Sequence, residues 1–413
     1  MARYDVAVLG AGVAGLAAAA LIAMSKRKVI VFDREERPGG LMASQEVQGM
    51  CFAPGPGATY GFERGGSLFL LSVALGMPVA PSPGPSAFQV VLPGRRITVS
   101  SEMSETLEEL RREFPREIDR AARMYREARS LRERSATSGT ASFLVRRRSA
   151  ARFLGAYGFS RELMSFLSVQ ARYFFGQPAE TLRLADLLLM VGGAPPLLKD
   201  GAQGVADRLR EVLVAAGGVG AFDAPWPELS LQKGRIASLR CGDGTVDART
   251  VLLNLPDASA ADALFLSVRR QALPVGMKPT VLALADYERP QDIVAVTIDA
   301  LQKGSGSPEE VVPLTASFLP GGVHHDPQRD RLIDRVRTLM PFVDEFVTAS
   351  HERDCAVRQV PLPFELSASL TAAGADALLY RPKTASNVYV LPDSTSSLTR
   401  AAYAGQRAAR KLA

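Results

Sequence analysis

The chain has 413 residues, a net charge of +6, 47% hydrophobic residues and 22% charged residues. This composition excludes an intrinsically disordered chain, and the length is enough for two or three domain-sized units. The three cysteines are scattered and odd in number, which excludes a disulfide framework and predicts a cytoplasmic protein.

The first forty residues predict a nucleotide-binding unit. An apolar strand over residues 5–9 leads into the pattern G-x-G-x-x-G over residues 10–15 and then into an alanine-rich helix. A second apolar strand over residues 29–32 ends in Asp33. A strand, a glycine turn, a helix and a strand ending in an acid are what a dinucleotide-binding βαβ unit needs. Glycines interrupt the uncharged stretch where a nucleotide turn needs them, so we expect neither a signal peptide nor a membrane span here.

Each glycine in this pattern, and the acid after it, has a physical task. Gly10 permits the tight turn, Gly12 leaves room for a pyrophosphate at the helix N-terminus, and Gly15 lets the helix pack closely on the strand. Asp33 is expected to accept hydrogen bonds from a ribose hydroxyl. The amides and the dipole of the helix N-terminus favour the phosphate charge.

A basic segment lies between Arg116 and Arg152, with eleven arginines against four acidic residues. One interpretation is a solvated helix with a polar face. The other is contact with an anionic membrane surface through the arginines and through Phe143, Leu144, Phe153 and Leu154. A nucleic-acid partner is not expected, because no pattern of stacking aromatic residues accompanies the charge.

Other elements follow from periodicity and from turn residues. In chain order we expect strands at 88–99 with a turn at 93–94, a helix over 102–134 broken near residue 115, a helix over 205–216, strands at 230–231, 235–240 and 250–255 with a hairpin turn at 243–244, a strand at 280–285, a helix over 327–340 capped at 326, a strand at 387–393 and a closing helix.

Several segments resemble, in the right order, those of the FAD-dependent phytoene desaturase, carotenoid isomerase and flavin amine oxidase superfamily. They are the acid and Gly-Gly pattern at 33–40, Phe-x-x-Gly-Pro at 52–56, the aromatic-glycine segment at 173–176, Asp-Gly-x-x-Gly at 200–204, the C-terminal strand at 387–393, and Gly405 and Arg407 in the closing helix. The resemblance implies an α/β fold with a discontinuous, Rossmann-like FAD-binding domain (1–75, 197–265 and 375–413). It also implies an inserted α+β substrate domain (76–196 and 266–374).

The resemblance further implies FAD as cofactor and hydride transfer between the flavin and a hydrophobic substrate, an isoprenoid or polyene. The apolar residues 166–167, 173–175 and 187–190 either line a long pocket or form a core. Tyr60, Tyr157 and Tyr173 are either proton relays or core aromatics, so no catalytic residue is assigned. A flavin amine oxidase and a non-catalytic relative are the alternative functions.

Four departures from the family pattern concern the cofactor. Proline precedes Asp393 where relatives have glycine, and serines and threonines over 394–400 replace a glycine-rich turn, although they can still cap a helix. Trp226 lies where a small residue is expected beside the adenine, and Leu41 lies where relatives often carry arginine. The expected cofactor-binding residues are Gly10, Gly12, Val13, Ala14, Gly15, Asp33, Arg34, Gly40, Leu41, Trp226 and Asp393.

Overall fold

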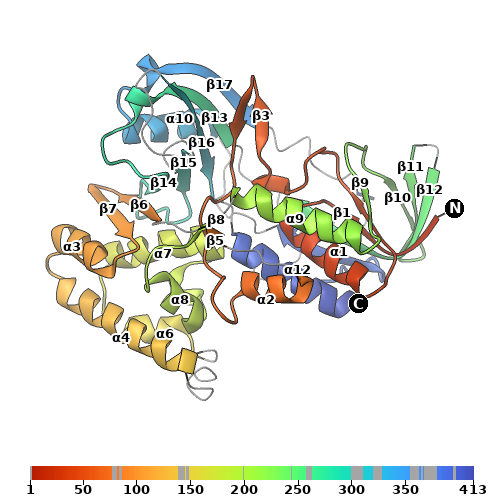
Figure 1. The fold of residues 1–413 in the computed structure, drawn as a ribbon, viewed down its shortest axis with the longest axis horizontal. Helices are drawn as coiled ribbons and strands as arrows, with labels where there is room; N and C mark the ends of the chain where they lie inside the picture. The colour runs from red at the N-terminus through yellow and green to blue at the C-terminus, as the bar shows by residue number, and fades with distance from the viewer. Residues whose placement is uncertain are drawn as a thin grey trace.

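The architecture is that of a mixed α/β protein built on two large sheets (Figure 1). The structure is a computed structural model. It describes residues 2–76, 81–82, 86–137, 145, 148–198, 200–242, 244–256, 263–298, 310–319, 328–353, 362–363, 366, 379–393 and 397–413.

The first sheet contains the predicted nucleotide unit. Its order is β10-β11-β12-β1-β2-β9, with β18 beside the second half of β12. The pairs of β1 with β12 and β2, of β2 with β9, and of β12 with β18 are parallel, whereas β10, β11 and β12 form an antiparallel meander. The strands are β1 (Ala2–Leu9), β2 (Val29–Phe32), β9 (Val219–Ala221), β10 (Glu228–Gln232), β11 (Arg235–Cys241), β12 (Gly244–Pro256) and β18 (Val388–Asp393).

Helices cover one face of this sheet. They are α1 (Val13–Met24), α2 (Ser67–Leu75), α9 (Gly201–Ala215) and α12 (Leu398–Leu412). The alanines of α1 are almost wholly buried, which lets α9 and α12 approach it on both sides. A Cβ atom at Gly405 would lie 2.6 Å from the carbonyl oxygen of Ala14, so α12 packs against the backbone of α1.

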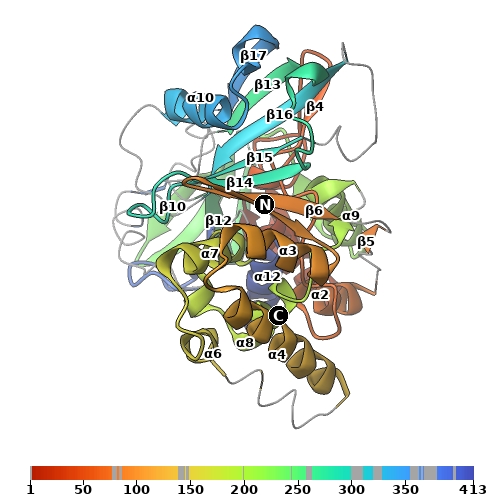
Figure 2. The same ribbon diagram turned by 90° about the vertical axis from the view of Figure 1, so that its left-hand side faces the viewer.

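The second sheet has the order β17-β13-β16-β15-β14-β6-β7. Its strands are β6 (Ala87–Leu92), β7 (Arg95–Ser100), β13 (Ala263–Arg269), β14 (Thr280–Leu284), β15 (Ile293–Thr297), β16 (Val311–Phe318) and β17 (Val347–Arg353). Helix α10 (Gln328–Leu339) packs on one side, and the helical part of the chain lies on the other (Figure 2). Two small ribbons complete the strands: β3 (Gln45–Val47) with β4 (Met50–Phe52), and β5 (Pro81–Ser82) with β8 (Leu197–Leu198). The division of the two sheets into two domains with the expected boundaries stays a prediction.

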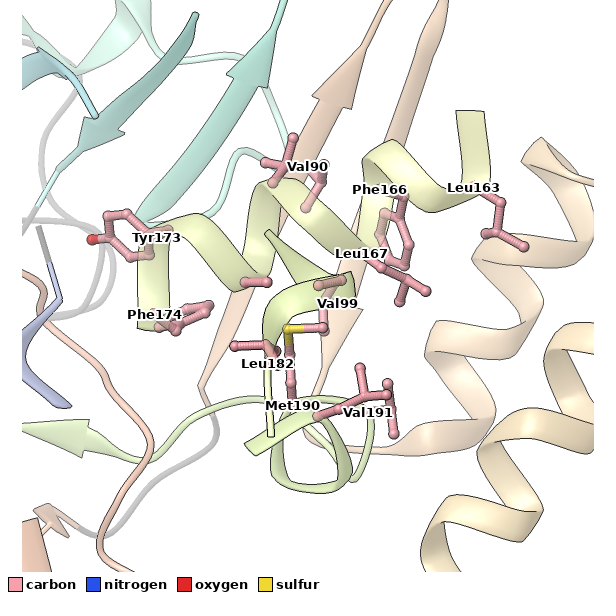
Figure 3. Packing of buried hydrophobic residues seen from close by; sticks show 14 of the residues in the cluster. Val90, Val99, Leu163, Phe166, Leu167, Tyr173, Phe174, Leu182, Met190 and Val191 are labelled. Atoms are coloured by element: carbon pink, nitrogen blue, oxygen red, sulfur yellow. The ribbon is translucent and has the colours of Figure 1, made fainter. Parts of the chain in front are cut away.

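The helical part forms its own core. Its helices are α3 (Met103–Glu113), α4 (Ile118–Thr137), α6 (Ala150–Gly155), α7 (Arg161–Phe175) and α8 (Leu184–Met190). Phe166 and Leu167 of α7 and Met190 of α8 are buried in the core cluster. Figure 3 shows Phe166 and Leu167 among these side chains, whereas the ring of Tyr173 points away from them. The interpretation that residues 166–167 and 187–190 form a core is therefore confirmed for those that are buried: Phe166, Leu167, Leu187, Leu188 and Met190.

Most predicted elements are confirmed. The helix expected over 205–216 begins earlier, at Gly201, because Asp200 takes a left-handed conformation with φ of 63° and starts the helix there. The cap expected at 326 and the residues Phe143 and Leu144 lie outside the described residues. Leu154 is buried, so its side chain is not available to a lipid surface, contrary to one interpretation of the basic segment, whereas Phe153 is only partly buried against the same core.

Candidate dinucleotide site

Helix α1 begins directly after the predicted glycine turn. Gly12 is the residue before the helix and provides no side-chain cap, and the first turn contains no acidic residue. The first amides of a helix have no carbonyl partner within the helix, so those of Val13 and Ala14 are available to a ligand at the carboxyl end of the sheet. The structure therefore brings the predicted pyrophosphate donors together at one place.

Asp33 holds the glycine turn. Its carboxylate is 7% exposed, and Oδ2 accepts from the amide of Ala11 at 2.5 Å while Oδ1 accepts from the amide of Glu35 at 3.0 Å. The ribose contact stays a prediction. Arg34, the next predicted residue, is exposed.

A second glycine turn, at Gly39 and Gly40, lies against the first one at the N-terminus of α1. The amide of Gly39 donates to the carbonyl of Ala11 at 2.8 Å. Gly39 and Gly40 have φ of 130° and 60°, which favours glycine at both positions. A Cβ atom at Gly40 would lie 3.0 Å from the Cα atom of Gly12, so the two turns touch. Leu41 is half-buried beside them.

Arg353, which sequence reasoning missed, clamps this second turn. It is 4% exposed at the end of β17, and its guanidinium donates to the carbonyls of Leu41 at 2.6 Å and Gly40 at 2.8 Å. The clamp joins the second sheet to the nucleotide unit across more than 300 residues of sequence. It brings a positive charge close to Leu41.

We expect Arg353→Lys to lower the free energy of unfolding by about 2–3 kcal/mol, because an ammonium cannot reproduce the two-pronged contact of a buried guanidinium. Urea denaturation measures the change. Arg329→Lys is the matched control, since Arg329 is exposed and pairs with Glu352 at the surface; its expected effect is below about 0.5 kcal/mol. Equal effects of the two substitutions would show that the clamp contributes nothing beyond a surface ion pair.

Asn254 is the second residue that sequence reasoning missed. It lies near the end of β12, is 5% exposed, and its Nδ2 donates to the carbonyl of Gly10 at 3.3 Å. Its Oδ1 is buried and has no hydrogen-bond partner among the described residues. An amide within the apolar run 251–255, at the carboxyl end of a parallel strand, is the signal that could have identified it.

All three glycines of the turn face Asn254. A Cβ atom at Gly10 would lie 2.1 Å from its backbone oxygen. Cβ atoms at Gly12 and Gly15 would lie 2.6 Å and 2.9 Å from its Nδ2. The glycine pattern is therefore required by packing within the chain, in addition to the approach of a pyrophosphate that the sequence predicts.

Trp226 and Tyr389 lie on opposite faces of the first sheet. Trp226 packs against the cluster that contains Ile30 and Phe32, whereas Tyr389 packs against the cluster that contains α1. They therefore do not form the aromatic cage of a flavin amine oxidase. Trp226 is close to the end of β2, because the amide of Ala224 donates to the carbonyl of Asp33 at 3.3 Å. Its contact with an adenine stays a prediction.

The start of α12 is held by hydroxyl groups, as the sequence predicts. Ser397 Oγ accepts from the amide of Arg400 and donates to the carbonyl of Phe174 at 2.5 Å. Thr399 Oγ1 donates to the carbonyl of Tyr60 at 3.0 Å. These hydroxyls contact the chain itself. Asp393 ends β18, beside Pro256 of β12, and its contact with the cofactor stays a prediction.

Two of the three tyrosines have structural tasks. The hydroxyl of Tyr60 donates to the carbonyl of Gly193 at 2.7 Å, and that of Tyr157 donates to Glu127 at 2.6 Å. Burial raises the pKa of both phenols above the ordinary value, most strongly for Tyr60. Both side chains are buried in the core cluster and their hydroxyls contact the chain itself, which supports the core interpretation for them.

Tyr173 instead lines a cavity of about 650 Å³ between α7 and the second sheet. Phe88, Phe174 and Met277 form apolar parts of the wall, and Ala58 and Leu197 border it from the side of the nucleotide unit. Charged and polar side chains also line the cavity: Ser100, Ser101, Glu102, Glu105 and Lys278. The volume lies in the range of small-molecule pockets.

Comparisons with known proteins agree with this arrangement. Residues 8–74 match the family profile of the NAD(P)-binding Rossmann-like domain. The chloroplastic prolycopene isomerase of Daucus carota is 34% identical over 129 residues, covering 30% of this chain and 21% of that protein. That of Arabidopsis thaliana is 31% identical over 118 residues, covering 28% and 20%. The match thus spans about a fifth of the length of these curated relatives.

Solved structures share the whole fold. Rab GDI from Plasmodium falciparum has a TM-score of 0.64 and 14% identity, covering 98% of this chain and 96% of that chain. An oxidoreductase from Methanosarcina mazei has a TM-score of 0.58 and 15% identity, covering 98% and 99%. Cyclohexylamine oxidase from Brevibacterium oxydans has a TM-score of 0.51 and 16% identity, covering 99% and 98%. The chain therefore has an α/β fold with a Rossmann-like dinucleotide-binding unit, as the resemblance implied.

Proposed function

We propose that the chain is an FAD-dependent oxidoreductase that transfers a hydride between the flavin and a hydrophobic substrate, an isoprenoid or polyene. The observation that carries the proposal is the uncapped N-terminus of α1, which faces the turn at Gly40 and lies beside Asp33. The similarity to prolycopene isomerases supports the substrate class, and the aromatic wall of the large cavity supports an apolar substrate.

The residues present fit the adenosine and pyrophosphate part of FAD. The first amides of α1 have no carbonyl partner within the helix and can donate to an anion, and Gly12 and Gly40 leave the backbone there without side chains. The amides of Val13 and Ala14 would hold the pyrophosphate.

The remaining contacts are assigned by position. Asp33 would hold the ribose, Trp226 would border the adenine, and Asp393 would face the ribityl chain. When bound, FAD supplies a ring that accepts or donates a hydride. The chain's own part is to place the substrate in the cavity and to exclude water with Phe88, Phe174 and Met277.

The charges in the cavity refine the substrate class. Glu102, Glu105 and Lys278 line it together with the apolar wall, and a pure hydrocarbon offers these groups no hydrogen-bond partner. A substrate with an apolar body and one polar end therefore fits the cavity better than an unsubstituted polyene. A flavin amine oxidase is not favoured, because Trp226 and Tyr389 are separated by the sheet.

The absorption spectrum of the purified protein tests the proposal. We expect visible flavin bands, either on purification or after incubation with FAD and removal of the free cofactor. A protein that stays colourless in both preparations would favour a non-catalytic relative, since a fold alone does not determine function. Analysis of lipids extracted from the protein then distinguishes a bound polyene from a polar-ended isoprenoid.

A further inference from the structure

Three neighbouring helices contain no acidic residue of their own, although Asp5 lies beside Lys28 at the end of α1. Helices α1, α2 and α12 contain no aspartate and no glutamate. They pack against one another along the lower edge of the molecule in Figure 1. We call the exposed side chains of α2 and α12, together with Met24 and residues 25–28 at the end of α1, the α2–α12 face.

Basic side chains gather on this face. The buried side of α12 packs against α1, and its exposed side presents Arg407, Arg410 and Lys411. Their spacing of three and four residues places them on one stripe of the helix. Residues 26–28, Lys-Arg-Lys, are also exposed, and Arg27 donates to the carbonyl of Ala413 at 2.6 Å. This contact puts the two basic groups side by side.

Apolar side chains of the same three helices are also exposed. Val73 and Leu70 of α2 are 63% and 40% exposed, one helical turn apart. Met24 at the end of α1 is 42% exposed, and Tyr403 of α12 is 39% exposed. These four are among nine large hydrophobic residues exposed in the described part of the chain, so nearly half of them belong to α1, α2 and α12.

The basic segment on α4 lacks this combination. Within its described residues, no large hydrophobic side chain is exposed, and Leu154 is buried. Arg120 donates to the carbonyl of Gly158, and the guanidinium of Arg123 lies over the ring of Tyr157. Helix α4 thus has the properties of a solvated helix that packs on a core, although its arginines are numerous.

We propose that the α2–α12 face docks on the surface of an anionic lipid bilayer. Anionic headgroups attract the basic stripe, and Leu70 and Val73 enter the interface between headgroups and acyl chains. A nucleic acid would use the charge and leave these two side chains in water. A second copy of this face would meet it with like charge. The docking is peripheral: among the described residues, no helix combines the length and the apolar character needed to cross a bilayer.

Sedimentation with lipid vesicles tests the proposal. We expect the protein to pellet with vesicles of phosphatidylcholine and phosphatidylglycerol, and to stay in the supernatant with phosphatidylcholine alone. Raising the salt from about 0.1 M to about 1 M shortens the screening length from roughly 10 Å to 3 Å and weakens the binding. Equal sedimentation with both vesicle types at both salt concentrations would overturn the proposal that the basic side chains bind anionic headgroups.

Paired variants locate the face. Arg407→Glu/Arg410→Glu should lower the binding constant at least about 25-fold, since each basic residue near an anionic leaflet contributes roughly fivefold. Leu70→Ser/Val73→Ser should lower it roughly fivefold to tenfold without changing net charge.

The charge-matched control is Arg126→Glu/Arg134→Glu on α4, which we expect to retain binding to within a few-fold. Thermal unfolding of each variant verifies that it is folded. A larger loss in the α4 variant than in the α12 variant would overturn the proposal. Unchanged binding in the Leu70/Val73 variant would also overturn it, because it would indicate a purely ionic partner such as nucleic acid. A loss of dimers in that variant in the absence of lipid would overturn it as well, because the face would then bind a second copy of the chain.

Discussion

We expect Gly10→Ala to lower the free energy of unfolding by about 3–5 kcal/mol, enough to unfold much of the protein. Gly10 has φ of 102°, a conformation that a residue with a side chain rarely adopts. A Cβ atom there would lie 2.1 Å from the backbone oxygen of Asn254. Because that oxygen belongs to β12, which is paired with β1 in the centre of the sheet, no side-chain rotation relieves the contact.

A control substitution at Gly49 separates the conformational cost of a positive φ from the cost of the steric contact. Gly49 has φ of 75°, in the turn between β3 and β4, and a Cβ atom there meets nothing within 4 Å. Gly49→Ala therefore carries only the conformational cost, about 1–2 kcal/mol. Urea denaturation of both variants gives the comparison. A Gly10 variant no less stable than the Gly49 variant would show that β12 does not approach the turn as closely as the structure has it.

The elements of the nucleotide unit were predictable because local signals agree there. The apolar strands at 5–9 and 29–32, the glycine turn and the alanine-rich helix each specify the same unit, and the fold neighbours confirm it. Tyr60 and Tyr157 were ambiguous in the sequence. Their hydrogen-bond partners, Gly193 and Glu127, are set by tertiary packing that no local pattern reveals.

The residues that sequence reasoning missed support the site from distant parts of the chain. Arg353 contacts the turn at Gly40 from the other sheet, and Asn254 contacts Gly10 from a neighbouring strand. Neither follows a motif, and each contact exists only when the two sheets or the parallel strands are assembled. The sequence motifs alone predict the two glycine turns. The side chains that hold these turns in place can be identified only from the complete fold.

Asn254 also determines how the role of Gly12 can be measured. Gly12 has φ of −63° and ψ of 162°, which alanine adopts without strain. The obstacle within the chain is the amide of Asn254, 2.6 Å from the Cβ position. We therefore expect Gly12→Ala to cost about 1–3 kcal/mol of stability in the wild-type background.

In the Asn254→Ala background the obstacle is gone. The same substitution should then cost less than about 0.5 kcal/mol, so the double-mutant cycle should give a coupling of about 1–2 kcal/mol between positions 12 and 254. Asn254→Ala alone should cost about 1 kcal/mol, since it removes one hydrogen bond and also an unpartnered oxygen.

We expect the affinity for FAD to respond differently from stability to the same pair of substitutions. If the pyrophosphate of FAD lies against the opening amides of α1, a methyl group at position 12 still obstructs it after Asn254 is removed. We expect Gly12→Ala/Asn254→Ala to be as stable as Asn254→Ala and to bind FAD at least about tenfold more weakly, a loss of about 1.4 kcal/mol. Titration of FAD into both variants, followed by flavin fluorescence, measures the difference. Equal affinity would mean that Gly12 is glycine only because of Asn254, and the pyrophosphate would have to lie elsewhere.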